Sequence, residues 1–333
     1  MEGLHKGLMQ VEGFESYEGV HCETVAAGAL LQHRGIKLSE PMLFGIGEGL
    51  GYIFWRMPGM KFPFIGGRNR PDALLGSICR NLGIKLESTQ TKSVKKAWQT
   101  VVNYLEKGIP VGLKLNSEHL GYLDTPLHLG CHYVAMYGCD ESDAYLIDAV
   151  PGGRVKVSLE NLARARAARG SMSSNHRTVV LEAACGGHAL DKSVRAAIKA
   201  NAEFHLHPPD RSIGVEGIRK TAYELKRWFG RSEDVPRDFC GLAKIMEQGG
   251  TGGAFFRNLY RDFLKESFEA LGHPALERAH QFFIEIAEKW SRVSSLLDTG
   301  GATGESRHVD EACAILKMIA AQEEAAMKGL QDL

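Results

Sequence analysis

The period of the hydrophobic pattern changes twice along the chain, and this change most limits the folds open to it. Apolar residues recur at helical spacing up to about residue 108, form short alternating runs over 110–182, and return to helical spacing beyond 190. The first period is typical of helices that bury one face, and the second of half-buried strands. Because the helices precede the strands and do not alternate with them, the pattern indicates an α+β fold and argues against a doubly wound sheet.

The central region predicts an antiparallel sheet. Its runs are short, rich in Val, Ile, Leu and Tyr, and separated by Gly, Asp, Asn and Pro. The predicted strands are Pro110–Leu115, His132–Tyr137, Ala144–Asp148, Arg154–Ser158 and Arg177–Glu182.

Helices are predicted before and after the sheet. The first half carries helices at Cys22–Arg34, Pro71–Leu82 and Val94–Lys107, and another that begins at Ser39. The second half has almost no strand signal. Its predicted helices are Asp191–Glu203, Gly214–Trp228, Arg237–Glu247, Ala254–Leu271, Pro274–Leu297 and Val309–Leu330. We place the domain boundary near Gly186–Gly187, which predicts a mixed domain at 1–186 and a helical domain at 187–333.

Length and composition exclude several classes of protein. A chain of 333 residues usually forms two domains. Lys+Arg and Asp+Glu both number 40, so the chain lacks the positive charge of a general nucleic-acid binder. Its longest apolar runs, such as Val25–Leu31, are far too short to span a membrane, and Met1–Val20 lacks the apolar core of a secretory signal. The seven cysteines include no CxxC pair, which suits a reducing compartment, so we predict a cytoplasmic protein.

Three residues form a candidate catalytic set. Cys22 opens a predicted helix, His132 opens a predicted strand, and Asp148 ends the next strand. A free thiol has a pKa of about 8.5, so the attacking thiolate is scarce at neutral pH. A helix N-terminus stabilises the anion, an imidazole can take the proton, and a third group can hold the imidazole by its other nitrogen. The backbone N–H of Cys22 can also stabilise a developing oxyanion.

Each of these residues also has a structural interpretation. Cys22 would be a buried helix cysteine, His132 a core histidine and Asp148 the first residue of a turn. A metal site formed by His128, Cys131, His132 and Cys139 fits no standard zinc spacing. A strand also places Cys131 and His132 on opposite faces, so we predict no metal.

Longer stretches of sequence resemble a known family. The N-terminal half resembles the butirosin biosynthesis protein H family in its N-terminal domain, through His21–Thr24, His33–Ile36 and Leu38–Phe54. The second half resembles the helical domain that often follows it. The matching residues there are Ile213–Ile218, Trp228, Glu247–Gly253, Arg257, Tyr260, Phe263 and Leu264.

The resemblance implies a papain-like cysteine protease fold followed by an all-α domain, and the activity of a cysteine acyltransferase. The name-giving member moves an aminoacyl group from an acyl carrier protein to an amine of an aminoglycoside. The family motif carries the nucleophile onto Cys22 and the base onto His132. Asp148 matches the orienting acid of papain-like bacteriocin-processing peptidases, which are similar in this hairpin. Those peptidases carry an oxyanion-hole Gln where this chain has Ser16, so the second oxyanion donor is Ser16, Tyr17 or another backbone N–H.

Several further residues are candidates for substrate binding. We expect His21, beside the nucleophile, to be a local cap or pocket residue. Gly47 lies in a glycine run, Gly45–Gly51, that is not a dinucleotide fingerprint and would let the backbone pass close to the active-site helix or the acyl chain.

The helix that carries Arg257 and Tyr260 follows Gly249–Gly253, whose amides would hold a phosphopantetheine phosphate; the alternative is a tight turn. Three arginines would meet an acidic carrier protein or form a solvated helix face. These arginines are Arg164, Arg166 and Arg169.

We therefore predict a cysteine acyltransferase of specialised-metabolite biosynthesis. It would take an acyl group from a carrier-protein or coenzyme A thioester and pass it to a small-molecule amine. The only cofactor expected is the phosphopantetheine or coenzyme A of the donor. The alternatives are a papain-like hydrolase with water as acceptor, and a non-catalytic binding protein of a biosynthetic cluster. Long apolar helices such as Val309–Leu330 would allow two subunits to pair.

Overall fold

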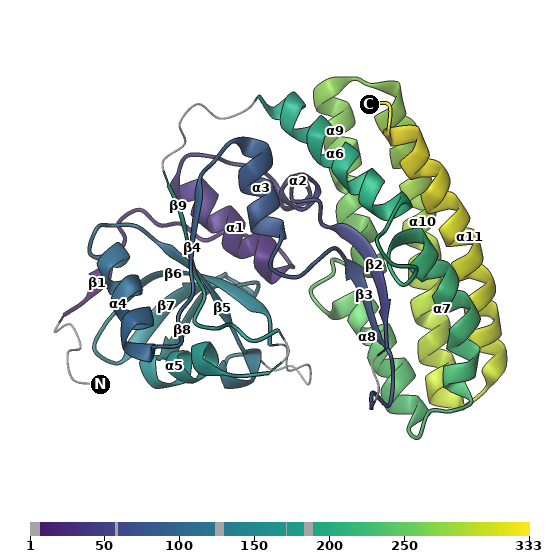
Figure 1. Cartoon of the computed structure of the whole chain (residues 1–333), viewed down its shortest axis with the longest axis horizontal. Coiled ribbons are helices and arrows are strands. Elements are labelled where there is room, and N and C mark those ends of the chain that lie inside the picture. The colour runs from purple at the N-terminus through teal and green to yellow at the C-terminus, as the bar shows by residue number, and fades with distance from the viewer. Residues whose placement is uncertain (1–6, 57–58, 124–129, 171, 183–188) are drawn as a thin grey trace. The chain divides into compact units, whose positions relative to one another are not determined.

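The computed structural model describes residues 7–56, 59–123, 130–170, 172–182 and 189–333 (Figure 1). The chain forms two compact units. The first comprises Met1–Leu43 and Leu82–Gly187, and the second comprises Phe44–Asn81 and His188–Leu333. The predicted domains, 1–186 and 187–333, divide the chain once, whereas the second unit also takes up the segment Phe44–Asn81 from the N-terminal half.

A seven-stranded antiparallel sheet forms the centre of the first unit. Its strand order is β4-β9-β5-β6-β7-β8, and β1 pairs with β6 outside this path. The strands are β1 (Met9–Gln10), β4 (Leu86–Thr89), β5 (Val111–Leu115), β6 (His132–Cys139), β7 (Asp143–Ile147), β8 (Arg154–Ser158) and β9 (Thr178–Leu181).

The five predicted strands correspond to β5 through β9 and are confirmed. The structure adds β1 and β4, which the hydrophobic pattern did not predict. Strand β4 reads Leu-Glu-Ser-Thr and lies at one end of the strand order, paired only with β9. An edge strand with three polar residues in four has no apolar alternation to reveal it.

Helix α1 (Cys22–His33) packs against β5, β6 and β7. Small residues such as Ala27 and Gly28 let it lie close to its neighbours, and an added Cβ at Gly28 would meet the ring of Tyr17. The unit also contains helices α4 (Val94–Leu105) and α5 (Leu159–Ala167) and a 3-10 turn, η1 (Ser117–His119). The side chains of Ser93 and Ser158 cap α4 and α5 by accepting backbone N–H groups.

The second unit is mainly helical and also holds a two-stranded sheet of β2 (Leu50–Trp55) and β3 (Phe64–Arg68). Its core centres on α10 and α11, which pair with each other, while α7 packs on α11 and β2 packs on α7 (Figure 1). The helices wholly within it are α6 (Leu190–Leu206), α7 (Gly214–Phe229), α8 (Gly241–Gln248), α9 (Arg257–Leu271), α10 (Pro274–Thr303) and α11 (Ser306–Leu330). The unit boundary cuts α2 (Glu40–Ile46) and α3 (Leu74–Leu82).

The six helices predicted in the second half are present, with two local corrections. The segment predicted as Arg237–Glu247 begins with a π-helical turn, η2 (Pro236–Cys240), before α8. Ala254–Phe256 does not belong to α9, because these residues have φ angles of 47°, 53° and 75° and form a left-handed turn, η3. Strands β2 and β3 of this unit are not among the strands that the hydrophobic pattern predicts. No helix in the described part of the chain is long and apolar enough to cross a membrane.

Candidate active site

Cys22 is the first residue of α1, and its side chain is only partly buried. The carboxylate of Glu40 anchors the chain just before it. Glu40 accepts the backbone N–H of Val20 at 3.0 Å, that of His21 at 2.9 Å, and the hydroxyl of Thr24 at 2.7 Å. This carboxylate therefore sets the direction in which the chain enters α1. The N–H of Cys22, as a first-turn amide, has no acceptor within the helix.

His132 and Asp148 come together on one face of the sheet. In the β6–β7 pair, Ala135 is opposite Ile147, so the next step places Val134 opposite Asp148. Paired residues share a face, and His132 is two residues from Val134 and shares it too. The imidazole Nε2 of His132 lies 2.7 Å from Oδ2 of Asp148.

The imidazole of His132 also interacts with Cys22. Burial lowers the pKa of His132, but the charge of Cys22, hydrogen bonds to Asp148 and Cys22, and the charge of Asp148 outweigh this effect. The balance raises the pKa of His132 to about 10. Because Nε2 faces Asp148, the nitrogen that faces Cys22 is Nδ1. The structure thus brings the three predicted catalytic residues into one hydrogen-bonded chain.

Asp148 is fully buried and held by three donors. Its Oδ2 accepts from His132 and from the hydroxyl of Tyr122 at 2.8 Å, and its Oδ1 accepts the backbone N–H of Ala149 at 2.7 Å. Sequence reasoning did not find Tyr122. It follows η1 in the connection between β5 and β6, where no periodicity or motif marks it.

The residues predicted to flank the nucleophile lie in the first unit. His21 is buried and occupies the N-cap position of α1, but its side chain makes no capping hydrogen bond; its Nδ1 lies 3.4 Å from the Thr24 hydroxyl. Ser16 lies beside Gly153, a glycine of the turn that follows Asp148. A Cβ added at Gly153 would lie 3.2 Å from the Cβ of Ser16. Its part in an oxyanion hole stays a prediction.

Gly47 belongs to the second unit, in the turn that follows α2. The glycine run was predicted to let the backbone pass close to the active-site helix or the acyl chain, but the close neighbour of Gly45 is Phe263. An added Cβ there would stand 2.1 Å from the ring of Phe263, so no larger residue fits without movement. The ring that approaches Gly45 is a core side chain of the second unit.

The substrate-binding roles predicted for Arg257 and Tyr260 need correction, because both side chains are sealed in the core of the second unit. The guanidinium of Arg257 donates to both carboxylate oxygens of Glu323 and to the carbonyls of Gly67 and Phe255. Tyr260 packs against Phe283, with ring centroids 4.9 Å apart. Neither residue presents a polar group to solvent, so both act as core residues.

The phosphate site proposed at Gly249–Gly253 is likewise replaced by a tight turn. Three of its glycines have positive φ angles. The N–H of Gly253 is taken by the hydroxyl of Thr251, and that of Ala254 by the carboxylate of Glu247. The N–H groups of Gly253 and Ala254, at the end of the segment, are therefore already in use.

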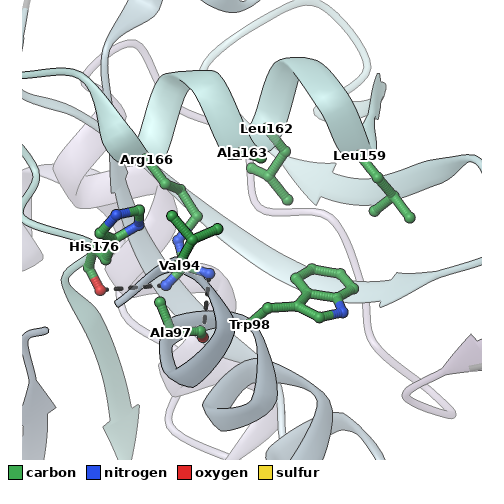
Figure 2. A pocket seen from close by; sticks show the side chains of 8 residues that line it. All are labelled: Val94, Ala97, Trp98, Leu159, Leu162, Ala163, Arg166 and His176. Atoms are coloured by element: carbon green, nitrogen blue, oxygen red, sulfur yellow. Dashed lines mark hydrogen bonds between the residues drawn. The ribbon is translucent and has the colours of Figure 1, made fainter. Parts of the chain in front are cut away.

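A small apolar pocket of about 30 Å³ lies between α4 and α5, with Arg166 and His176 at one end and Trp98 and Leu159 at the other (Figure 2). Arg166, one of the residues that line this pocket, is buried. Its guanidinium donates to the carbonyls of Ala97 and His176 and to the hydroxyl of Thr178. Burial lowers its pKa to about 10. Arg166 is thus not part of a solvated or protein-docking face, unlike the exposed Arg164 and Arg169.

Cys79, Cys139 and Cys313 differ from Cys22 because they are buried. Burial raises the pKa of Cys79 to about 12 and that of Cys139 to about 11. Within the described ranges no group of three or more His, Cys, Asp or Glu side chains is placed to hold a metal ion. His128 and Cys185 lie outside these ranges.

Comparison with protein families finds two matched segments in the chain. Residues 21–149 match the family described as Butirosin biosynthesis protein H, N-terminal, and residues 160–330 match Domain of unknown function (DUF4872). The chain therefore belongs to the family that joins a butirosin biosynthesis protein H N-terminal domain to a DUF4872 domain, as the sequence resemblance indicated. The first description marks it as a biosynthesis-related protein. No curated protein matches the chain. Cys22, His132 and Asp148 all fall within the first matched segment.

Proposed function

We propose that the protein is a cysteine-dependent acyltransferase that makes an amide from an acyl thioester in a biosynthetic pathway. One observation carries the proposal: a single imidazole, His132, engages the Cys22 side chain and, through its other nitrogen, the buried carboxylate of Asp148. Such a chain of thiol, imidazole and carboxylate is what activation of a sulfur nucleophile requires. The family match supports a biosynthetic setting.

The arrangement of elements supports a papain-like fold for the first unit. The nucleophile opens a helix that packs against an antiparallel sheet, and the sheet carries the base and the acid on neighbouring strands. The same elements occur in the same order along the chain as in papain-like enzymes.

In the first half of the proposed reaction, the Cys22 thiolate attacks the carbonyl carbon of the donor thioester. The tetrahedral oxyanion collapses, the bond to the donor sulfur breaks, and His132 protonates the departing thiolate. The product is an S-acyl Cys22 and a free donor thiol. Exchange of one thioester for another needs no ATP and no redox cofactor.

In the second half, the acceptor amine attacks the acyl-enzyme carbonyl. His132, now neutral, takes a proton from the amine as the carbon–nitrogen bond forms. The carbon–sulfur bond breaks, which releases the amide and restores the thiolate paired with the imidazolium. Asp148 keeps the imidazole oriented through both halves. The N–H of Cys22 is the proposed first oxyanion donor.

The donor is proposed to be a carrier-protein or coenzyme A thioester, whose phosphopantetheine arm is the only cofactor involved. The acceptor is proposed to be a small-molecule amine. The same catalytic chain with water as acceptor would make a hydrolase, and the experiment below distinguishes the two.

The test is intact-mass measurement after incubation with N-acetylcysteamine and coenzyme A thioesters of several acyl groups, without acceptor. Cys22→Ala serves as the negative variant. Cys240→Ala is the matched control, since that cysteine is also partly buried but lies in the second unit.

An increase equal to the acyl mass in the wild type and in Cys240→Ala, absent in Cys22→Ala, is the expected result. Free acid released only by proteins that keep Cys22, without transfer to any added amine, would favour the hydrolase. Neither adduct nor acid with any donor would count against catalysis at Cys22.

A further inference from the structure

Tyr122 is hydrogen-bonded to Asp148, a member of the proposed catalytic chain. Its hydroxyl donates to Oδ2 of Asp148 at 2.8 Å, the same oxygen that lies 2.7 Å from Nε2 of His132. Burial raises the pKa of Tyr122, and the charge and hydrogen bond of Asp148 and the charge of Cys22 raise it further. Cys22 and Asp148 are therefore the charged groups that act on both Tyr122 and His132.

Hydrogen bonds hold both oxygens of the Asp148 carboxylate in place. The backbone N–H of Ala149 holds Oδ1, and the Tyr122 hydroxyl holds Oδ2. Rotation of the carboxylate about its terminal bond would break both hydrogen bonds at once. Without the Tyr122 hydroxyl, Oδ2 would lose one of these two side-chain contacts and keep the one to His132.

We propose that Tyr122 is a positioning residue that fixes the Asp148 carboxylate and, through it, the orientation of the His132 imidazole toward Cys22. This inference rests on the proposed function, because it assigns Tyr122 to the same site. Since the pKa of its hydroxyl is raised, Tyr122 remains a donor throughout the neutral range. A carboxylate that accepts from two side-chain donors and an amide is fixed in orientation, which keeps the imidazole of His132 aligned with Cys22.

The test measures the rate at which iodoacetamide alkylates Cys22 as a function of pH, read from the mass of the Cys22 peptide. No acyl donor is needed. In Tyr122→Phe, which removes only the hydroxyl, we expect alkylation at neutral pH to slow by about tenfold, the lower end of the effect of one hydrogen bond to a charged group. The midpoint of the pH profile should shift as well.

Tyr145→Phe is the matched control. The Tyr145 hydroxyl also donates to a carboxylate, Asp140, and Tyr145 lies on β7, the strand that leads into Asp148. It makes no contact with the catalytic chain in the described structure, so its removal should leave both the rate and the midpoint unchanged.

A double-mutant cycle shows whether Tyr122 acts through Asp148. In an Asp148→Ala background, Tyr122→Phe should change the alkylation rate no further, because the carboxylate it positions is gone. An equal effect in both backgrounds, or an unchanged rate and midpoint in Tyr122→Phe alone, would overturn the proposal.

A second variant covers the case in which Tyr122→Phe does not fold. Incorporation of 3-fluorotyrosine at position 122 keeps the ring and hydroxyl but makes the hydroxyl a stronger donor. A shifted midpoint supports the proposal, and an unchanged one contradicts it. The acyl-loading experiment can fail while this one succeeds. In that case Tyr122 positions Asp148 and His132 beside a reactive thiol whose acyl substrate is different from those tried.

Discussion

The two compact units each contain a histidine–carboxylate pair of the same geometry and opposite character. In the first, His132 Nε2 lies 2.7 Å from Asp148 Oδ2; in the second, His205 Nε2 lies 2.7 Å from Glu323 Oε2. The His132 side chain is 12% exposed, whereas both members of the second pair are 0% exposed. The comparison teaches that a short histidine–carboxylate contact does not by itself make a catalytic site.

The two pairs differ in what surrounds the other imidazole nitrogen, Nδ1. In the first pair that nitrogen serves Cys22, a partly exposed thiol at a helix start. In the second pair, Nδ1 of His205 has no hydrogen-bond partner within the described structure. The carboxylate there is engaged by Arg257 and by the indole N–H of Trp290, over which the guanidinium stacks at 4.8 Å. The proposed role of the first pair is proton transfer, whereas the second pair joins helices α6 and α11.

Replacing each histidine in turn by alanine should give the largest difference between the two pairs. We expect His132→Ala to slow alkylation of Cys22 at neutral pH by about a hundredfold, the scale of a lost acid–base group. His205→Ala should leave that rate within about twofold, because His205 pairs with Glu323 and not with the thiol. Alkylation followed by peptide mass measures both. A comparable loss of rate in His205→Ala would remove the distinction between the pairs.

The largest stability effect should come from Glu323→Gln. This change leaves the buried Arg257 cation without its anion, which costs about 3–5 kcal/mol in the free energy of unfolding. The neighbouring Glu324→Gln removes an anion from the partly exposed pair with Arg219 and should cost at most about 1 kcal/mol. Urea unfolding of both variants measures the difference. Equal losses would show that the sealed pair is no more structural than a surface one.

The pH dependence of stability should have a separate limb for each pair. Burial raises the pKa of Glu323, but Arg257 and His205 outweigh it and lower the pKa from 4.5 to about 2. Its stabilisation is therefore present above pH 4.5 and lost as the pH falls toward 2. The pKa of His132 is raised from 6.5 to about 10, so its stabilisation is full below pH 6.5 and lost as the pH rises toward 10.

Unfolding free energies over this pH range provide the measurement. Glu323→Gln should flatten the acid limb alone, and His132→Gln the alkaline limb alone. If either variant altered the opposite limb, the assignment of limbs to pairs would be wrong.

The smallest effect on stability is expected at Tyr260, which is buried in the core of the second unit. The hydroxyl of Tyr260 is buried with no hydrogen-bond partner within the described structure. Tyr260→Phe should therefore leave the free energy of unfolding unchanged or raise it by about 1 kcal/mol, since it removes an unsatisfied polar group. Alkylation of Cys22 should not change, in contrast to Tyr122→Phe. A clear loss of stability would mean that this hydroxyl has a partner after all.

The residues of the proposed catalytic chain were predictable where local sequence patterns marked them. A helix start at Cys22 and a hairpin between His132 and Asp148 are both local features, and strand alternation places the last two on one face. Glu40 and Tyr122 were not predictable. Glu40 reaches the amides before Cys22 from the next helix, and Tyr122 reaches Asp148 from an irregular connection; neither contact has a periodic signal.

The roles of the polar residues in the second unit were the least predictable. Arg257 and Tyr260 follow a glycine-rich segment, a pattern that suggested an anion site. Whether an arginine at a helix start faces solvent or the core depends on what packs over it. Here Glu323 on α11 and Trp290 on α10 close over Arg257, and both are far from it in the sequence.

The sequence by itself determined the class of fold, the predicted strands and helices of the two halves, the family and the order of Cys22, His132 and Asp148, because each depends on local periodicity or on contiguous motifs. Only the tertiary structure decided that Phe44–Asn81 packs with the helical unit. It alone showed which histidine–carboxylate pair is sealed and which faces a thiol. Burial and long-range hydrogen bonds depend on the sum of all packing around a side chain, and no short stretch of sequence contains that sum.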